Sequence, residues 1–150
     1  MAVTIITSQA PDAKPVGVSK NLDVFWQELV TVPQYEVPEQ IFGGTTFIVP
    51  GAAEIITPLL VCNTSAVLAS ISVRVLRKVA DETDEDPAVF DYFTIINGLL
   101  VQPNDLVTIP LNGQVFVTGE QLEAIANTSE SLTVHISYTV GQPEQDDVNG

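Results

Sequence analysis

Chemistry at catalytic and metal sites most often needs histidine or cysteine, and this 150-residue chain has one of each, His135 and Cys62. A histidine acts as a general base only where a nucleophile lies within hydrogen-bonding reach, and structural zinc takes four Cys or His ligands. Nothing near His135 in the sequence provides a nucleophile, and two ligands cannot complete a zinc site. We therefore expect an exposed His135 on the polar face of a strand and a small buried thiol at Cys62.

The segment 81–87, DETDEDP, packs five acids into six positions. Clustered carboxylates are ligands for hard cations such as Ca²⁺. This segment, however, lacks the glycine and the spacing of an EF-hand loop, and like charges at such density repel one another. The sequence therefore predicts a solvated loop, with a loosely bound cation as the alternative.

Two Asn-Thr-Ser triplets, at 63–65 and 127–129, match the acceptor pattern for N-glycosylation. The same residue types also form tight turns, because their side chains bond to nearby backbone groups. We interpret both triplets as turns. The chain has no GxSxG, no HExxH, no phosphate-binding glycine loop and no ordered carboxylate pair. The sequence therefore predicts no enzyme activity, no cofactor and no metal site.

The chain has nineteen acidic and five basic residues, which gives a formal net charge of −14 and a pI near 4.1. Such a surface repels phosphate, so we expect no direct nucleic-acid binding. No apolar run approaches the ~20 residues of a spanning helix, so we expect no membrane association. The start of the chain lacks the pattern of a secretory signal. Arg74, Arg77 and Lys78 are three of the five bases, and we expect them to pair with acids of this chain or of a neighbouring copy.

These residues must be positioned by β-strands, because apolar and polar residues alternate along much of the chain after Thr45. The alternation is clear at 69–75 and clearest at 132–140, where it is typical of half-buried antiparallel strands. A further strand is expected at 54–63, broken or edged by Pro58. Short strands with turn signals about every 8–12 residues predict an all-β fold, an antiparallel β-sandwich of jelly-roll or Ig-like type.

Three dipeptides predict the turns between these strands. Pro50-Gly51 and Asn97-Gly98 are both turn signals, and Asn112-Gly113 is the strongest hairpin signal in the chain. The segment 119–127 is ambiguous by itself. It begins with a pattern typical of a helix start, but its apolar residues also alternate as in a strand.

Residues 1–44 differ in composition from the rest of the chain, because prolines interrupt them repeatedly. The segment 22–32, LDVFWQELVTV, contains the only tryptophan. Its apolar spacing fits a helix, whereas Val30 and Val32 before a proline favour a strand, and we interpret the segment as extended. The sequence thus predicts three parts, namely an extended N-terminal arm or anchor at 1–44, a β-sandwich at 45–141 and an acidic C-terminal tail at 142–150.

Several short motifs occur in a fixed order along the chain. They are the Val-Pro-Gly turn at 49–51, the VCNT strand end at 61–64, the alternating SVRVL at 72–76, the proline-led segment at 103–109 and the segment at 119–126 that begins with glycine. This order resembles that of small β-sandwich virion proteins of tailed bacteriophages, over roughly residues 45–140. The resemblance implies that 119–126 is a strand. Residues 1–44 and the acidic segment have no counterpart in the family pattern.

The resemblance implies a non-enzymatic structural protein of a bacteriophage virion. Our first hypothesis is a capsid decoration or cement protein that binds and stabilises the outer capsid shell. Its partners would be the major capsid protein or other virion proteins, and it would act as a homo-oligomer or in many symmetric copies. It would be made in the cytoplasm of the bacterial host and located on the outer capsid surface or in the head-tail region.

The residues expected at such an interface are Phe25, Trp26, Arg74, Arg77 and Lys78. The two aromatic residues would anchor the contact, because large aromatic side chains dominate the energetics of interfaces. Two alternatives stay open. One is a neck, tail or fibre component of the virion, and the other is a carbohydrate-binding module that recognises host-surface glycans through exposed rings such as Phe90 and Tyr92.

Overall fold

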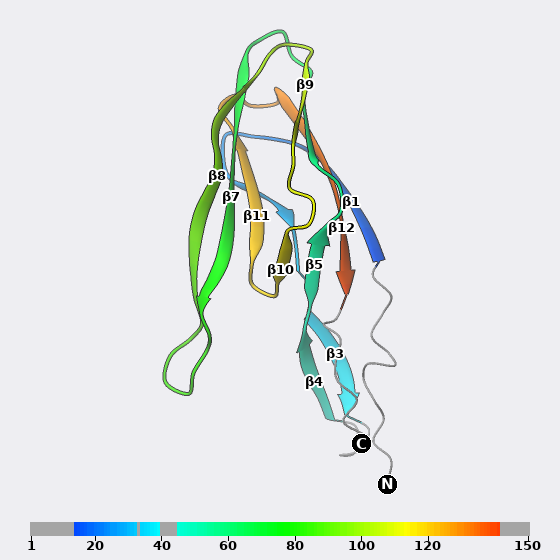
Figure 1. The fold of residues 1–150 in the computed structure, drawn as a ribbon, viewed down its shortest axis with the longest axis vertical. Coiled ribbons are helices and arrows are strands. Elements are labelled where there is room, and N and C mark those ends of the chain that lie inside the picture. The colour runs from blue at the N-terminus through cyan, green and yellow to red at the C-terminus, as the bar shows by residue number, and fades with distance from the viewer. Residues whose placement is uncertain (1–13, 33, 40–44, 142–150) are drawn as a thin grey trace.

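The computed structural model describes residues 14–32, 34–39 and 45–141, and leaves the side chains of 14, 34–39 and 45–50 undescribed. The described residues contain no helix. They form two antiparallel sheets that pack face to face, together with a small two-stranded sheet (Figure 1). The expected all-β sandwich is confirmed.

The larger sheet is organised around β12. Its strands are β1 (Lys14–Asn21), β5 (Ala52–Ile55), β6 (Leu59–Asn63), β9 (Leu106–Ile109), β10 (Val115–Val117) and β12 (Leu132–Gly141). On one side β12 pairs with β1 along its length, and on the other it pairs first with β6 and then with β5. β9 lies beside β6, and β10 lies beside β5. β5 and β6 are separated at Pro58, so the expected break in this strand is confirmed.

The smaller sheet has the strand order β2-β11-β7-β8. Its strands are β2 (Gln27–Val30), β7 (Ala69–Ala80), β8 (Val89–Val101) and β11 (Gln121–Ala126). Within the ambiguous segment 119–127, residues 121–126 thus form a strand, and the resemblance implied a strand at 119–126. The remaining hairpin, β3 (Gln34–Glu39) with β4 (Thr45–Pro50), extends beyond the sandwich (Figure 1). Only Gly51 separates β4 from β5, and the two strands continue in one direction, so the turn predicted at Pro50-Gly51 is wrong.

The core lies between the two sheets and follows the predicted alternation. Every second residue is buried on β7 from Ala69 to Val75 and on β12 from Leu132 to Tyr138, and Phe116 of β10 is the largest fully buried side chain among the described residues. Burial of such side chains stabilises a fold by about 1.5–3 kcal/mol each before entropy is counted. The buried residues of the two central strands are Ala69, Ile71, Val73, Val75, Leu132, Val134, Ile136 and Tyr138.

Residues 14–32, which we expected in the arm, belong to the sandwich. β1 pairs with β12, β2 pairs with β11, and Leu22, Leu29 and Val30 are at most 2% exposed in the core. The extended interpretation of 22–32 is confirmed for Gln27–Val30, whereas residues 24–25 form a bend. The arm of residues 1–44 needs correction, because side chains of 14–32 complete the core. Pro15 is compatible with β1, since edge strands tolerate proline. Residues 1–13 and 40–44 of the expected arm, and the tail at 142–150, lie outside the described residues.

The hairpin predicted at Asn112-Gly113 is wrong. β9 and β10 run in one direction beside β6 and β5, so the chain bulges at this point and continues. The Gly113 amide donates to the Ile55 carbonyl (2.7 Å), and the Ile55 amide donates to the Gln114 carbonyl (2.9 Å). Gly113 has a φ of 94°, which suits glycine. The bulge lies opposite the break at Pro58. β9 pairs with β6 before the bulge, and β10 pairs with β5 after it.

The turn predicted at Asn97-Gly98 is also wrong, because β8 continues through it to Val101. Gly98 has a φ of 71°, and its amide donates to the Ser72 hydroxyl (2.9 Å). The pairing of β8 with β7 shifts register here. A glycine at positive φ in a strand is typical of a β-bulge, and the apolar residues beyond it still reach the core.

Asn63 begins one of the two Asn-Thr-Ser triplets and is only 1% exposed. Its Nδ2 donates to the carbonyls of Val67 (2.8 Å) and Val101 (2.9 Å). Its Oδ1 accepts from the Ser65 amide (2.9 Å) and hydroxyl (2.7 Å). This side chain therefore builds the turn after β6 and ties it to the end of β8, which links the larger sheet to the smaller one. The interpretation of the triplet as a turn agrees with this geometry.

We predict that Asn63→Ala lowers the free energy of unfolding by about 2–4 kcal/mol, because it removes the hydrogen bonds to the buried Val101 carbonyl and to the partly buried Val67 carbonyl and Ser65 amide. Urea denaturation followed by circular dichroism measures this change. Thr64→Ala, which alters the exposed neighbouring side chain, is the control and should change the value by less than about 0.5 kcal/mol. Equal stability of the two variants would contradict the role assigned to Asn63.

Candidate interaction surfaces

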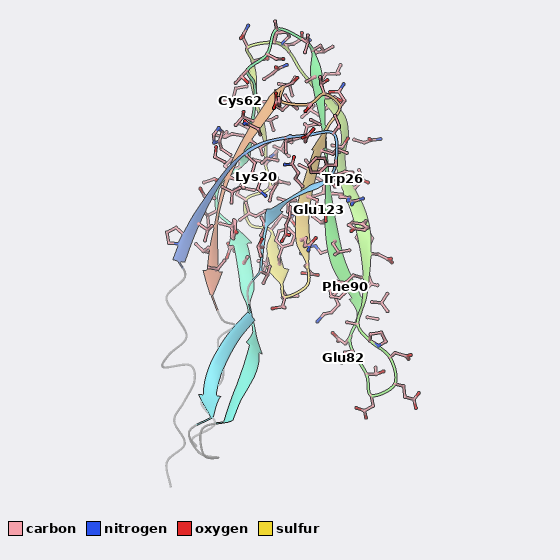
Figure 2. All side chains as sticks on the ribbon, turned by 180° about the vertical axis from the view of Figure 1, so that it is seen from behind. Lys20, Trp26, Cys62, Glu82, Phe90 and Glu123 are labelled. Carbon is pink, nitrogen blue, oxygen red and sulfur yellow. The ribbon has the colours of Figure 1, made fainter. Side chains whose placement is uncertain are left out.

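The outer face of the smaller sheet is centred on Arg74 of β7. The carbon of its guanidinium lies 4.0 Å from the ring centroid of Trp26 and 3.8 Å from that of Tyr92. Its Nε lies 2.8 Å from Oε1 of Glu123. A planar, weakly hydrated guanidinium stacks well on aromatic rings. Arg74 thus joins residues of β8 and β11 and the residue before β2, and Figure 2 shows Trp26 and Glu123 on this part of the sheet.

A second network is built around the carboxylate of Glu120, which is only 8% exposed. Oε1 accepts from Nη1 of Arg77 (3.2 Å) and from the Val117 amide (2.9 Å). Oε2 accepts from the Lys78 amide (2.9 Å). Charged acceptors form stronger hydrogen bonds than neutral ones. This carboxylate therefore fixes the tight connection between β10 and β11 against the end of β7.

Arg77 extends the same network to the larger sheet. Its Nη2 donates to Oε1 of Gln114 (2.9 Å), and its Nη1 also donates to the Val115 carbonyl. The guanidinium lies 4.2 Å from the ring centroid of Phe116 in the core. Arg77 therefore covers the end of the core at Phe116, and it links β7 of the smaller sheet to β10 of the larger one.

The three bases singled out in the sequence all pair with acids of this chain. Arg74 pairs with Glu123 and Arg77 with Glu120, and Nζ of Lys78 lies 3.2 Å from Oδ1 of Asp81. The structure therefore supplies the pairing within one copy. A contact of these bases with a neighbouring copy stays a prediction.

Phe25 lies apart from these networks, in the bend between β1 and β2, and is 58% exposed. Other exposed apolar side chains occur at the same end of the sandwich, in the connection between β6 and β7 and near the end of β8 (Figure 1). We call this surface the apolar end. Its residues are Val24, Phe25, Val67, Leu68 and Leu100.

The acidic segment lies at the opposite end of the molecule. It connects β7 to β8, residues 81–87 are all exposed, and Figure 2 shows Glu82 far from the apolar end. Within residues 14–32, 34–39 and 45–141, no group of three or more His, Cys, Asp or Glu side chains is arranged to hold a metal ion. The structure thus separates the apolar end from the acidic loop along the length of the sandwich.

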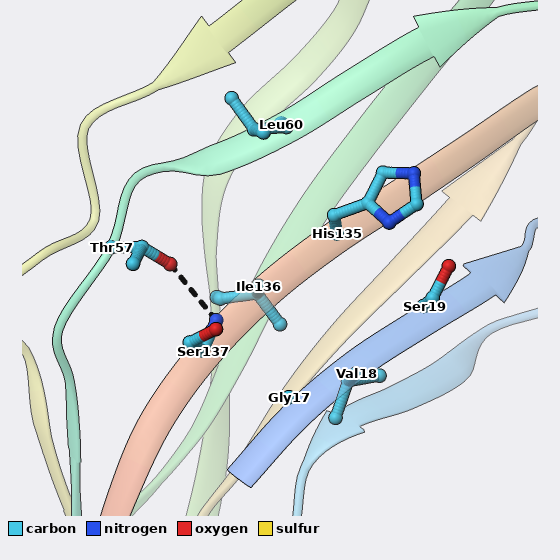
Figure 3. A pocket seen from close by; sticks show the side chains of 8 residues that line it. All are labelled: Gly17, Val18, Ser19, Thr57, Leu60, His135, Ile136 and Ser137. Carbon is cyan, nitrogen blue, oxygen red and sulfur yellow. Dashed lines mark hydrogen bonds between the residues drawn. The ribbon is translucent and has the colours of Figure 1, made fainter. Parts of the chain in front are cut away.

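His135 lies on the outer face of the larger sheet, exposed as expected. It borders a groove of about 330 Å³, at which the Ser137 amide donates to the Thr57 hydroxyl (2.9 Å) (Figure 3). Among the described residues, the imidazole has no hydrogen-bond or ion-pair partner.

Cys62 is partly exposed, so the expected buried thiol is wrong. The reason is that Asn63 and the other alternate residues of β6 point inward, which turns Cys62 outward.

Phe90 and Tyr92 do not form a free pair of rings on one surface. A Cβ atom on Gly119 would lie 2.6 Å from Cζ of Phe90, so the Phe90 ring packs directly on the glycine backbone. The Tyr92 ring stacks on Arg74. Phe90 thus packs within the chain, whereas Tyr92 stacks on Arg74 and is still 52% exposed, and glycan binding stays a prediction.

Sequence reasoning missed the buried acids Glu120 and Glu123. The alternation of β11 assigns Glu123 to an outer face, and only the pairing of β11 with β7 places it beside Arg74. Charge patterning along one segment cannot reveal such a partner, because the two residues are 49 positions apart.

Comparison of the chain with protein-family models, curated proteins and solved structures found no match. No helix long and apolar enough to cross a membrane occurs among the described residues. The functional argument therefore depends on the surfaces of this chain.

We predict that Arg74→Ala shifts the fluorescence of Trp26 to longer wavelength, because removal of the guanidinium exposes one face of the only indole to water. It also leaves the carboxylate of Glu123 without its charged partner, so the free energy of unfolding should fall by about 1–3 kcal/mol. Lys78→Ala is the control, since its partner Asp81 is largely exposed and such pairs contribute little. An unchanged emission spectrum in Arg74→Ala would contradict the stacked arrangement.

Proposed function

We propose that the chain is a non-enzymatic structural protein of a bacteriophage virion, a capsid decoration protein that docks through its apolar end on the outer capsid shell. The observation that supports this best is the placement of exposed apolar loops and of the acidic loop at opposite ends of one rigid sandwich. One end is suited to contact a protein, and the other is suited to face water. The order of the sequence motifs, which resembles that of phage virion sandwiches, supports the same proposal.

The apolar end has the composition expected of a docking surface. Phe25 is its aromatic residue, the other four residues are aliphatic, and exposed apolar surface of this kind marks interaction sites. Hydrogen bonds from Asn63 hold the connection after β6, at Val67, and the end of β8, at Val101. A surface with fixed loops loses less conformational entropy on binding.

The net charge of −14 complements this arrangement. Acidic loops that point away from the shell would give the particle surface one sign of charge and so oppose clumping of particles. A single small contact is weak, but many symmetric copies on one shell would add avidity. The partner would be the major capsid protein, and the protein would join the particle after synthesis in the host cytoplasm.

Copy number on purified particles tests the proposal and separates it from a neck, tail or fibre role. A decoration protein binds a site that repeats over the whole shell, so quantitative mass spectrometry should find it in proportion to the major capsid protein. A count of only a few copies per particle would contradict decoration and favour the neck, tail or fibre alternative.

We predict that Phe25→Ser weakens rebinding of the purified protein to depleted particles by about tenfold or more, because it removes the aromatic residue of the apolar end. Val115→Ser is the matched control, since Val115 is an exposed aliphatic residue on β10, away from that end. Both variants should unfold like the wild type, because both side chains are exposed. Equal losses of binding in the two variants would contradict docking through the apolar end.

A further inference from the structure

β8 is the outermost strand of the smaller sheet and has thirteen residues. It pairs with β7 on one side, and no described strand lies on its other side. Its outward backbone groups are therefore free to pair with another strand. Five of the thirteen large exposed apolar residues of the described chain lie on this one strand, namely Val89, Tyr92, Phe93, Ile95 and Leu100.

Edge strands of soluble proteins are usually protected by lysine, by proline, by short length, by β-bulges or by a covering loop. The pairing of β8 with β7 shifts register near Ile95 and near Gly98, so β8 does contain bulges. β8 has neither lysine nor proline, and Asp91 is its only charged residue. Its exposed apolar side chains lie on both faces of the sheet. Phe93 pairs with Val75, whose side chain points to the core, and Tyr92 pairs with Leu76 on the outer face. A strand added beside β8 would cover apolar surface on both faces.

We propose that β8 is a self-association edge, at which β8 of a second copy of this chain pairs in antiparallel orientation across a two-fold axis near Thr94. This pairing places Phe93 of each copy opposite Ile95 of the other, an aromatic residue against a β-branched one. Asp91 lies opposite Asn97 of the second copy, so no like charges meet. The two smaller sheets become one continuous sheet.

The distribution of charge selects the antiparallel orientation. The acidic loop at 81–87 immediately precedes β8. Parallel pairing would bring the acidic loops of two copies together, and like charges at such short range repel strongly. Antiparallel pairing puts the two loops at opposite ends of the joined sheet. The proposal does not depend on the capsid role, and a failure of either leaves the other standing.

Sedimentation equilibrium of the full chain tests the association. The wild type should form dimers, and added salt should strengthen them, because it screens the repulsion between two chains of charge −14. Phe93→Lys should be monomeric and should unfold like the wild type. Val67→Lys, which adds the same charge to an exposed residue of the apolar end, should still dimerise. A wild type that stays monomeric at high concentration and high salt would overturn the proposal, as would equal loss of dimer in both variants.

Disulfide trapping tests the orientation in a Cys62→Ser background. Thr94→Cys lies at the proposed axis and should give a covalent dimer on oxidation, whereas Asp84→Cys in the acidic loop should not. Cross-linking through Asp84→Cys would indicate parallel pairing and overturn the proposal. A chain that dimerises in solution but gives no Thr94→Cys cross-link would place the contact elsewhere and also overturn the proposal.

Discussion

The fold depends on a carboxylate that is almost completely removed from water. Glu120 follows the turn after β10, and its two oxygens accept from Arg77 and from the amides of Val117 and Lys78. An unpaired charge at this burial would cost several kcal/mol, so the connection between β10 and β11 and the end of β7 must keep these partners in place. Because Arg77 also covers Phe116 and bonds to β10, the same carboxylate fixes the smaller sheet against the larger one.

At the other end of the sandwich, Asn63 has the corresponding role. Its four hydrogen bonds hold the turn after β6 to the end of β8, again across the two sheets. A polar group buried with all its bonds satisfied specifies one arrangement of the loops around it. The sandwich is thus fixed by polar contacts at both ends, with the apolar core between them. The surfaces that we propose for assembly are attached to this rigid body.

The sequence was sufficient for the fold class and for the buried faces of β7 and β12, because period-two alternation reports directly which residues face a core. It failed where turn residues served another purpose. Asn112-Gly113 forms a bulge instead of the predicted hairpin, and Asn97-Gly98 forms a bulge within β8 instead of the predicted turn, since the chain continues along the same sheet on both sides of each. The prediction also failed for residues 14–32, because the prolines of this region were interpreted as signs of an extended arm, whereas Pro15 lies in the edge strand β1. The partners of Arg74 could not be predicted, because cross-strand register is a property of the whole sheet.

Assembly through defined surfaces is the central claim, and electron cryo-microscopy of intact particles tests it most directly. The account predicts ordered density for the sandwich at repeated positions on the shell, with Phe25 and its aliphatic neighbours at the contact and the loop at 81–87 in solvent. It would be contradicted by particles that lack the protein, or by a map in which the acidic loop touches the shell and Phe25 faces water.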